Sequence, residues 1–218
     1  MRPLLALDTS TPHGSVALGV DGSVVRERAI GTSVRHAESL LPAISELLDG
    51  AGLTPADLAG VVVGAGPGSF TGVRVAGATA RGLVRALGIP LYAYSSLLAL
   101  AEATDRTDRA VCALFDARRG EVYAGCYRVV REGWTELLEP TAAPIGEITT
   151  AVAPYGPVYA AEASIVLPDA GERVMPVRTS AAALIRLAAM DPEAGRIAEP
   201  PHWEPHYLRP PGAVRTPW

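Results

Sequence analysis

The sequence predicts an α/β protein with two lobes, each built on a mixed sheet flanked by helices. Residues 1–104 begin with strand patterns joined by short turns and continue with alternating helix and strand patterns, an order that favours parallel strands after an antiparallel start. The same order begins again after a polar break at residues 104–109. We therefore expect an N-terminal lobe at residues 1–104 and a smaller C-terminal lobe at residues 105–218, although no repeat is visible in the sequence itself.

Three strands are expected at the start of the N-terminal lobe. Leu4–Leu7 is a short apolar run, and Ser15–Val20 is a second strand pattern. Asp21-Gly22 is typical of a two-residue hairpin turn that leads into Ser23–Ala29. The start is therefore predicted to be a three-stranded antiparallel meander.

Helices and strands alternate in the rest of this lobe. Between His36 and Ala51 apolar residues recur every three or four positions, which indicates one face of an amphipathic helix. The further expected elements, in order, are a capped turn at Thr54–Asp57, a buried strand at Gly60–Gly64, a helix from about Val73 to Leu87, a strand at Leu91–Tyr94 and a short helix from Ser95 to about Ala103.

The second lobe is expected to follow the same order. Its predicted elements are strands at Ala110–Phe115 and Glu121–Val130 around a turn at Arg118–Gly120, a strand after the turn at Glu132-Gly133, a strand at Val158–Ala161 and a helix at Ser180–Met190. From Glu199 the chain is rich in proline, so this tail is predicted to be extended and to lie over the surface or on a partner.

The composition is that of a folded chain without a membrane anchor. Apolar residues make up 49% of the 218 residues and charged residues 19%. Asp8 interrupts the apolar N-terminal run before it could form a signal peptide, and we expect a cytoplasmic protein. Cys112 and Cys126 stand among apolar neighbours, which favours buried free thiols over a disulfide or a metal pair.

The charged residues exclude several kinds of chemistry. All 19 basic residues are arginine, so the chain has no phosphate-loop lysine, no Schiff-base lysine and no Ser-Lys nucleophile pair. The net charge of −4 comes without a basic block, so any RNA that the chain serves is expected to be held mainly by a partner.

Two polar loops are candidates for holding an anion. Asp8, Thr9 and Ser10 directly follow the first strand, where hydroxyl and backbone N–H groups could hold phosphate, although ordinary turn chemistry explains these residues about as well. The segment Gly66–Arg74 concentrates glycine between a strand and a helix, so its backbone can approach a phosphate or another chain closely. The candidate nucleotide or phosphate loop comprises Asp8, Thr9, Ser10, Gly66, Gly68 and Ser69.

Small residues form a row on the helix that follows this segment. Gly72, Ala76 and Ala80 are four residues apart, with Gly77 and Ala78 beside them, and such a row lets two helices approach closely. Spacing alone leaves open whether the row faces a partner or the protein's own sheet.

The histidines do not form a recognisable catalytic or metal site. His202 and His206 flank Glu204, but Pro205 breaks the helix that would bring the two imidazoles to one metal ion. His36 has no evident nucleophile as a partner, so a role at a helix start is favoured. We expect no metal site and no catalytic residue in this chain.

Several segments in the same order closely resemble the TsaB (YeaZ) family. They cover nearly the whole chain, and Gly-Pro-Gly-Ser-Phe-Thr-Gly-Val-Arg is the most specific among them. The matching segments are Leu7–Ser10, Ser15–Leu18, Arg35-His36, Gly66–Arg74, Asp116–Tyr123 and Tyr207–Arg209. The resemblance implies a two-lobed actin-like fold (ASKHA, ribonuclease H-like), in which the candidate phosphate loop is vestigial.

The family resemblance also implies a function in tRNA modification. It implies a pseudo-enzyme relative of TsaD, the subunit that transfers a threonylcarbamoyl group to the adenosine next to the anticodon of tRNAs that read ANN codons. The metal-binding histidines of TsaD would correspond to Ser96 and Leu100, which cannot replace them as ligands. ATP or ADP and a metal ion are therefore expected on partner subunits and not on this chain.

The implied partners are a TsaD-type catalytic subunit and a TsaE-type ATPase, with tRNA reached through the complex. A homodimer is plausible when the partner is absent. Two alternatives remain open, a stand-alone glycoprotease-like metallohydrolase and a small ASKHA-type kinase that uses the loop at Asp8. The expected partner interface comprises Leu40, Ile44, Gly72, Val73, Ala76, Gly77 and Ala80.

Overall fold

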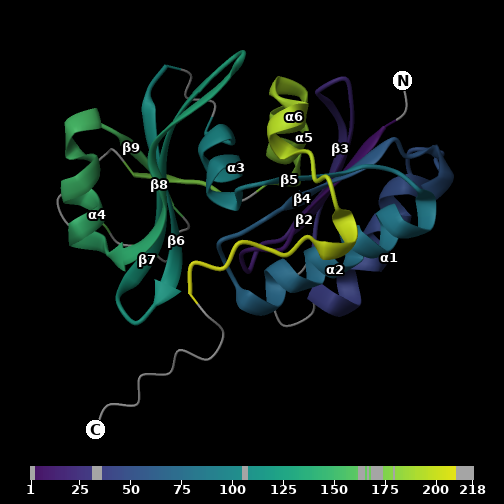
Figure 1. Cartoon of the computed structure of the whole chain (residues 1–218), viewed down its shortest axis with the longest axis horizontal. Helices are drawn as coiled ribbons and strands as arrows, with labels where there is room; N and C mark the ends of the chain where they lie inside the picture. Colours follow the sequence, from purple (N-terminus) through teal and green to yellow (C-terminus); the bar gives the residue numbers. More distant parts are fainter. Residues whose placement is uncertain are drawn as a thin grey trace, which may run out of the picture.

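Two five-stranded mixed sheets form the framework of the computed structural model (Figure 1). The first sheet has the strand order β3-β2-β1-β4-β5, and the second has the order β10-β9-β6-β7-β8. The structure describes residues 3–30, 36–104, 108–161, 165, 167, 174–178 and 180–209. The predicted α/β fold with mixed sheets is confirmed.

The first sheet begins as an antiparallel meander and continues with parallel strands, as predicted. Strand β1 pairs antiparallel with β2 and parallel with β4, because the crossover from the meander returns beside β1. All residues of β4 are buried, which explains why that strand is apolar on both faces. The strands are β1 (Leu4–Asp8), β2 (Ser15–Val20), β3 (Ser23–Ala29), β4 (Gly60–Gly64) and β5 (Leu91–Tyr94).

The second sheet repeats this arrangement, and its strands β7 and β9 have the predicted bounds, whereas β6 is longer than predicted. Strand β6 extends to Arg118, where the left-handed backbone of Arg118, Arg119 and Gly120 forms the predicted turn into β7. The short strand β10 was not predicted. The strands are β6 (Ala110–Arg118), β7 (Glu121–Val130), β8 (Gly133–Pro144), β9 (Val158–Ala161) and β10 (Val174–Pro176).

The helices agree with the predictions except at a few ends. Helix α2 begins at Phe70 and not at Val73, because the Ser69 hydroxyl caps it by accepting from the Gly72 N–H at 3.3 Å. Helix α4 was not predicted. The helices are α1 (His36–Asp49), η2 (Pro55–Asp57), α2 (Phe70–Leu87), α3 (Ser96–Glu102), α4 (Ile145–Val152), η3 (Ala153–Tyr155), α5 (Ala181–Met190), α6 (Pro192–Gly195) and η5 (Pro200–His202).

The helices form layers around and between the two sheets (Figure 1). Helices α1 and α2 pack on one face of the first sheet and share its apolar core. Helices α3 and α5 belong to a core cluster that also contains side chains of both sheets, so they join the lobes. Helix α4 covers the outer side of the second sheet.

Helix α5 packs on the first sheet, although it follows the second sheet in the chain. Its N-terminus is held by that sheet, because the Ala181 N–H donates to Ser15 Oγ at 2.8 Å and the Ala182 N–H donates to Glu27 at 3.2 Å. The predicted boundary at residue 104 does fall between the two sheets, but residues 105–107 lie outside the described residues. The division into two domains stays a prediction, because α5 and the tail return to the first lobe.

Residues 199–209 of the C-terminal tail are extended apart from the short 3₁₀ turn η5, which the sequence did not predict. Trp203 packs over Gly77 of α2, where an added Cβ atom would come within 3.2 Å of the indole ring. The His206 N–H donates to the Ala65 carbonyl at 2.8 Å. The tail therefore lies across α2 and reaches the glycine-rich segment, as Figure 1 shows in yellow.

The end of the described tail contacts the second lobe. Tyr207 accepts a hydrogen bond from Arg74 at 3.0 Å, and Arg209 donates to the Ala117 carbonyl at 3.1 Å and pairs with Glu121. This segment thus links α2 to the hairpin between β6 and β7. No helix in the described part of the chain combines the length and the apolar character needed to cross a membrane.

Candidate functional site

The two polar loops predicted from the sequence meet at the carboxyl ends of β1 and β4. The Ser69 N–H donates to the Ser10 carbonyl at 2.7 Å, and Thr9 Oγ1 donates to the Gly72 carbonyl at 2.6 Å. Within the first loop the Ser10 N–H donates to Asp8 Oδ1 at 2.7 Å. The structure thus brings the residues of the candidate phosphate loop together.

The glycines of this region are required by close backbone contacts. A Cβ atom at Gly68 would collide with the Ser10 carbonyl, and one at Gly72 would collide with the carbonyl of Thr9. The backbone φ of Gly66 is 86°, a value that residues other than glycine rarely adopt. The glycine-rich pattern therefore has a structural reason that is independent of any ligand.

A cavity of about 530 Å³ lies between these loops and the β6–β7 hairpin. Its walls come from both lobes, and they include three of the segments on which the family resemblance rests. Ser10 is 2% exposed and lines the cavity, and its Oγ atom has no hydrogen-bond partner among the described residues. The lining segments are Ser10–Pro12, Gly68–Thr71, Phe115–Arg118 and Tyr123.

The described residues give this cavity hydroxyl groups, backbone N–H groups and one ion pair. The Asp8 carboxylate is 1% exposed and lies behind the loop. Arg118 pairs with Asp116 at 3.3 Å, and its own side chain is largely in solvent. In the part of the chain that the structure describes, no three His, Cys, Asp or Glu side chains lie close enough together to share a metal ion.

Ser96 and Leu100, which the family resemblance placed at the metal-binding positions of TsaD, and the neighbouring Ser95 have structural roles here. Ser95 Oγ caps α3 by accepting from the Leu98 N–H at 3.4 Å. Ser96 Oγ accepts from the Gly66 N–H at 3.2 Å, and Leu100 is fully buried in the apolar core. Neither Ser96 nor Leu100 offers a nitrogen or sulfur ligand to a metal ion.

The structure corrects the predicted partner interface. Ala76 and Ala80 belong to the apolar core between α1, α2 and the first sheet, and Gly77 lies under Trp203 of the tail. The small-residue row therefore faces the protein's own sheet and is buried within the chain. All seven predicted interface residues are buried within the chain: Leu40, Ile44, Gly72, Val73, Ala76, Gly77 and Ala80.

A second row of small residues lies on the exposed side of α2. Ala78, Gly82 and Ala86 are also four residues apart, and all three are exposed. The space over Gly82 is open, because a Cβ atom built there meets no other atom within 4 Å. On α1, Leu41 is 58% exposed, although it is a large apolar residue. We call the exposed residues Leu41, Ala78, Gly82 and Ala86 the helix face.

The two helices carry opposite charges. Helix α2 carries three arginines and no acidic residue, and helix α1 carries Glu38, Glu46 and Asp49. Arg74, Arg81 and Arg85 are all exposed. Their positions mark the solvent side of α2, so they are the sequence signal that distinguishes the exposed row from the buried one.

The remaining predicted residues do not add a catalytic group. Cys112 and Cys126 are buried and free, as predicted, and they lie opposite each other in β6 and β7. Burial raises the pKa of both thiols, that of Cys126 to about 11. His202 and His206 lie in the tail over α2. Arg35, which belongs to the resemblance, lies outside the described residues.

Comparisons with known proteins agree over nearly the whole chain. Residues 30–189 match the family model described as TsaD: tRNA N6-adenosine threonylcarbamoyltransferase. The chain is 33% identical over 222 residues to the tRNA threonylcarbamoyladenosine biosynthesis protein TsaB of Escherichia coli (strain K12), with 94% of each chain covered. It is 35% identical over 156 residues to the protein of the same name from Bacillus subtilis (strain 168), with 65% of this chain and 68% of the relative covered.

Two solved structures have the same fold as the chain. YeaZ from Pseudomonas aeruginosa superposes with a TM-score of 0.74 at 32% identity, covering 95% of this chain and 100% of that one. An uncharacterized protein from the same organism, described as similar to the peptidase YEAZ, superposes with a TM-score of 0.76 at 31% identity, covering 96% of this chain and 100% of that one.

Proposed function

Because the chain belongs to the TsaB (YeaZ) family, we propose that it takes part in tRNA threonylcarbamoyladenosine biosynthesis as a non-catalytic scaffold subunit. It binds a TsaD-type catalytic subunit, together with a TsaE-type ATPase, and reaches tRNA through that complex. The observation that carries this proposal is the helix face, which combines an exposed row of small residues on α2 with the exposed Leu41 on the neighbouring helix α1.

The helix face suits the docking of another pair of helices. Small side chains at Ala78, Gly82 and Ala86 allow a partner helix to approach the α2 backbone closely. Leu41 supplies an apolar side chain that a partner would remove from water. The acidic side of α1 and the basic side of α2 fix the orientation of a partner with the reverse arrangement of charge.

A non-catalytic role is supported by the residues at the two positions that the resemblance placed at the metal site of TsaD. Ser96 stabilises the Gly66 backbone and Leu100 fills the core, so both positions serve the fold. ATP or ADP and a metal ion are proposed to bind the partner subunits. The same helix face would form a homodimer in the absence of the partner, because a two-fold axis would place each acidic helix beside a basic one.

The proposal is tested by titrating the purified chain with the TsaD-type subunit of the same organism in a calorimeter. Gly82→Trp fills the open space over α2, and Leu41→Arg places a charge on the helix face. We expect both variants to lose at least tenfold in affinity, because they obstruct the proposed contact. Val25→Arg is the matched control, since Val25 is also 58% exposed but lies on β3. Equal affinities for Leu41→Arg and Val25→Arg would contradict the assignment of the helix face.

A kinase is a second candidate, and the observation in its favour is Ser10, a residue that lines the cavity and whose buried hydroxyl has no hydrogen-bond partner among the described residues. A kinase requires the isolated chain to bind ATP with magnesium and to turn it over. Calorimetry followed by a phosphate-release assay measures both properties. We expect no turnover, and a measurable rate that Ser10→Ala abolishes would replace the scaffold proposal with this one.

A metallohydrolase is the other alternative. It is considered because one of the similar solved structures is described as similar to a peptidase. It would need a metal ion in this chain. Elemental analysis of the purified protein, combined with a peptidase assay before and after chelation, separates it from the scaffold role. We expect less than stoichiometric metal and no cleavage.

A further inference from the structure

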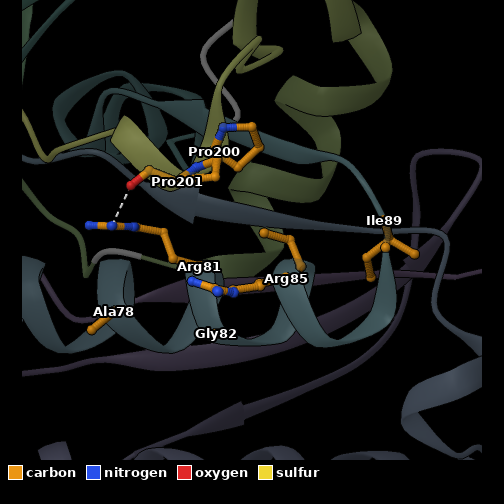
Figure 2. A pocket seen from close by; sticks show the side chains of 9 residues that line it. Ala78, Arg81, Gly82, Arg85, Ile89, Pro200 and Pro201 are labelled. Atoms are coloured by element: carbon orange, nitrogen blue, oxygen red, sulfur yellow. Dashed lines mark hydrogen bonds between the residues drawn. The ribbon is translucent and has the colours of Figure 1, made fainter.

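A groove of about 610 Å³ lies beside the C-terminal half of α2, between this helix and the 3₁₀ turn η5 of the tail (Figure 2). Ala78 and Gly82 line it on the helix side, and Pro200 and Pro201 line it on the tail side. Ile89, which follows the helix, closes one end. The groove shares Ala78 and Gly82 with the helix face, so it continues that surface toward the tail.

The groove is basic as well as apolar. Arg81 and Arg85 both line it, and no acidic side chain among the described residues does so. Figure 2 shows Arg81 reaching from α2 to the Pro201 carbonyl, to which it donates a hydrogen bond that fixes its guanidinium. Arg85 has no ion-pair partner among the described residues, so its charge is available to a ligand.

The groove also has room for an apolar side chain. Nothing lies within 4 Å of a Cβ atom built on Gly82, and the buried Val84 lines the groove one turn away from Arg81. Proline rings on the opposite side offer further apolar surface without a side-chain charge. A ligand that carries both an apolar group and a carboxylate therefore matches the lining.

We propose that this groove binds an acidic amphipathic segment of the TsaD-type partner subunit. A carboxylate of that segment pairs with Arg85, and an apolar side chain of the same segment packs over Gly82. This inference rests on the proposed function, because it assigns a chemical character to the partner that docks on the helix face.

A protein segment fits the groove better than the phosphate backbone of RNA. Apart from two arginines the lining is apolar, whereas phosphate recognition relies on several charged contacts. The chain also has a net charge of −4.

Arg85 has a second role that the test must separate from binding. It lies in the last turn of α2, where a positive charge stabilises the negative end of the helix dipole. That role alone predicts a small loss of thermal stability when the charge is removed and no change in affinity for a partner. Melting temperatures are therefore measured for every variant beside the affinities.

The experiment titrates the full chain with the TsaD-type subunit at low and at physiological salt. We expect Arg85→Gln to raise the Kd about tenfold and Arg85→Glu to raise it about a hundredfold, as for a charged pair at an interface. The affinity of Arg85→Gln should also depend less on salt than that of the wild type, because one ion pair is missing. Arg109→Gln, an exposed arginine of the second lobe, is the matched control and should bind like the wild type.

Three results would overturn the inference. Wild-type affinity and wild-type salt dependence of Arg85→Gln would show that the groove is not occupied in the complex, while the scaffold role itself would stand. A change confined to self-association, measured by sizing the chain alone, would assign the groove to a second copy. A change confined to tRNA affinity would assign it to RNA. If the wild-type chain does not bind the TsaD-type subunit at all, the proposed function is itself contradicted, and the groove proposal is contradicted with it.

Discussion

Single residues explain why the glycine-rich segment has its pattern. Gly68 and Gly72 allow the start of α2 to lie directly against the loop that follows β1, so each is fixed by a backbone contact. The sequence indicated that a backbone must come close to something here, but it could not identify Thr9 and Ser10 as the neighbours. That information is a distance between segments about 60 residues apart, which local patterns do not contain.

Two glycines of the same helix should respond in opposite ways to replacement by alanine. Gly72→Ala places a Cβ atom against the Thr9 carbonyl, so we expect it to lower the free energy of unfolding by about 1–3 kcal/mol. Gly82→Ala meets open space, so it should raise the free energy of unfolding by up to about 1 kcal/mol through helix propensity. Urea unfolding of both variants measures the difference, and equal effects would refute the packing of α2 on the first loop.

The buried thiols give a prediction for alkaline pH. Burial raises the pKa of Cys126 to about 11, whereas an unfolded cysteine titrates near pH 8.5. Between these values the unfolded chain has lost a thiol proton that the folded chain keeps, so the free energy of unfolding should fall as the pH rises from about 9 to 11. Below pH 8 this contribution is fully present and independent of pH.

The measurement is urea unfolding at a series of pH values, with Cys126→Ala as the comparison. The variant should lose stability less steeply than the wild type over the same alkaline range. In addition, neither thiol of the native protein should react rapidly with a thiol reagent at pH 8, because both are protonated and buried. Rapid reaction in the native state would contradict the burial of Cys112 and Cys126.

At the level of elements, the strand and helix order was largely predictable and the helix faces were not. Alternating and apolar runs predicted nine of the ten described strands and the helices α1, α2, α3 and α5, because each pattern is local. The two small-residue rows of α2 have the same spacing, so spacing could not say which row faces the sheet. The arginines at 74, 81 and 85 do distinguish them, since charged side chains stay in solvent. Helix α4 was missed because it follows a proline-rich stretch.

Helices α3 and α5 are joined by an ion pair that could not be read from the sequence. Arg186 donates to both carboxylate oxygens of Glu102, at 2.5 and 2.7 Å, and the Glu102 side chain is only 5% exposed. The two residues are 84 positions apart. Because α3 lies against the second sheet and α5 against the first, this pair connects the lobes.

Removing one partner of this pair should destabilise the whole molecule. Arg186→Leu leaves the buried Glu102 carboxylate without its guanidinium partner, so we expect the free energy of unfolding to fall by about 2 kcal/mol. This loss is smaller than for a fully buried pair, because Arg186 is about one-third exposed. The double variant Glu102→Leu, Arg186→Leu should recover part of that loss, because no charge remains buried. Urea unfolding of the single and double variants gives the comparison, and a neutral single variant would show that the pair does not join the lobes energetically.

At the level of the whole molecule, the two-lobed actin-like fold that the resemblance implied is confirmed by the two mixed sheets and by the likeness to YeaZ. The described part of the tail completes this architecture, since it leaves α6, crosses α2 and contacts the β6–β7 hairpin. The sequence predicted its extended form from proline content, but its path depends on partners such as Ala65 and Ala117 that no local pattern reveals. The helix face and the groove remain on the outer side of this assembly.

The central claim is that the chain serves tRNA modification by docking through the helix face. Its most direct test is in vitro reconstitution with the TsaD-type subunit, the TsaE-type ATPase, ATP and the threonylcarbamoyl donor, with threonylcarbamoyladenosine in tRNA measured by mass spectrometry. We predict no product from the chain alone, product from the complete mixture, and loss of product with Gly82→Trp at an unchanged melting temperature. Product formed by the isolated chain, or a wild-type rate with Gly82→Trp, would contradict the account.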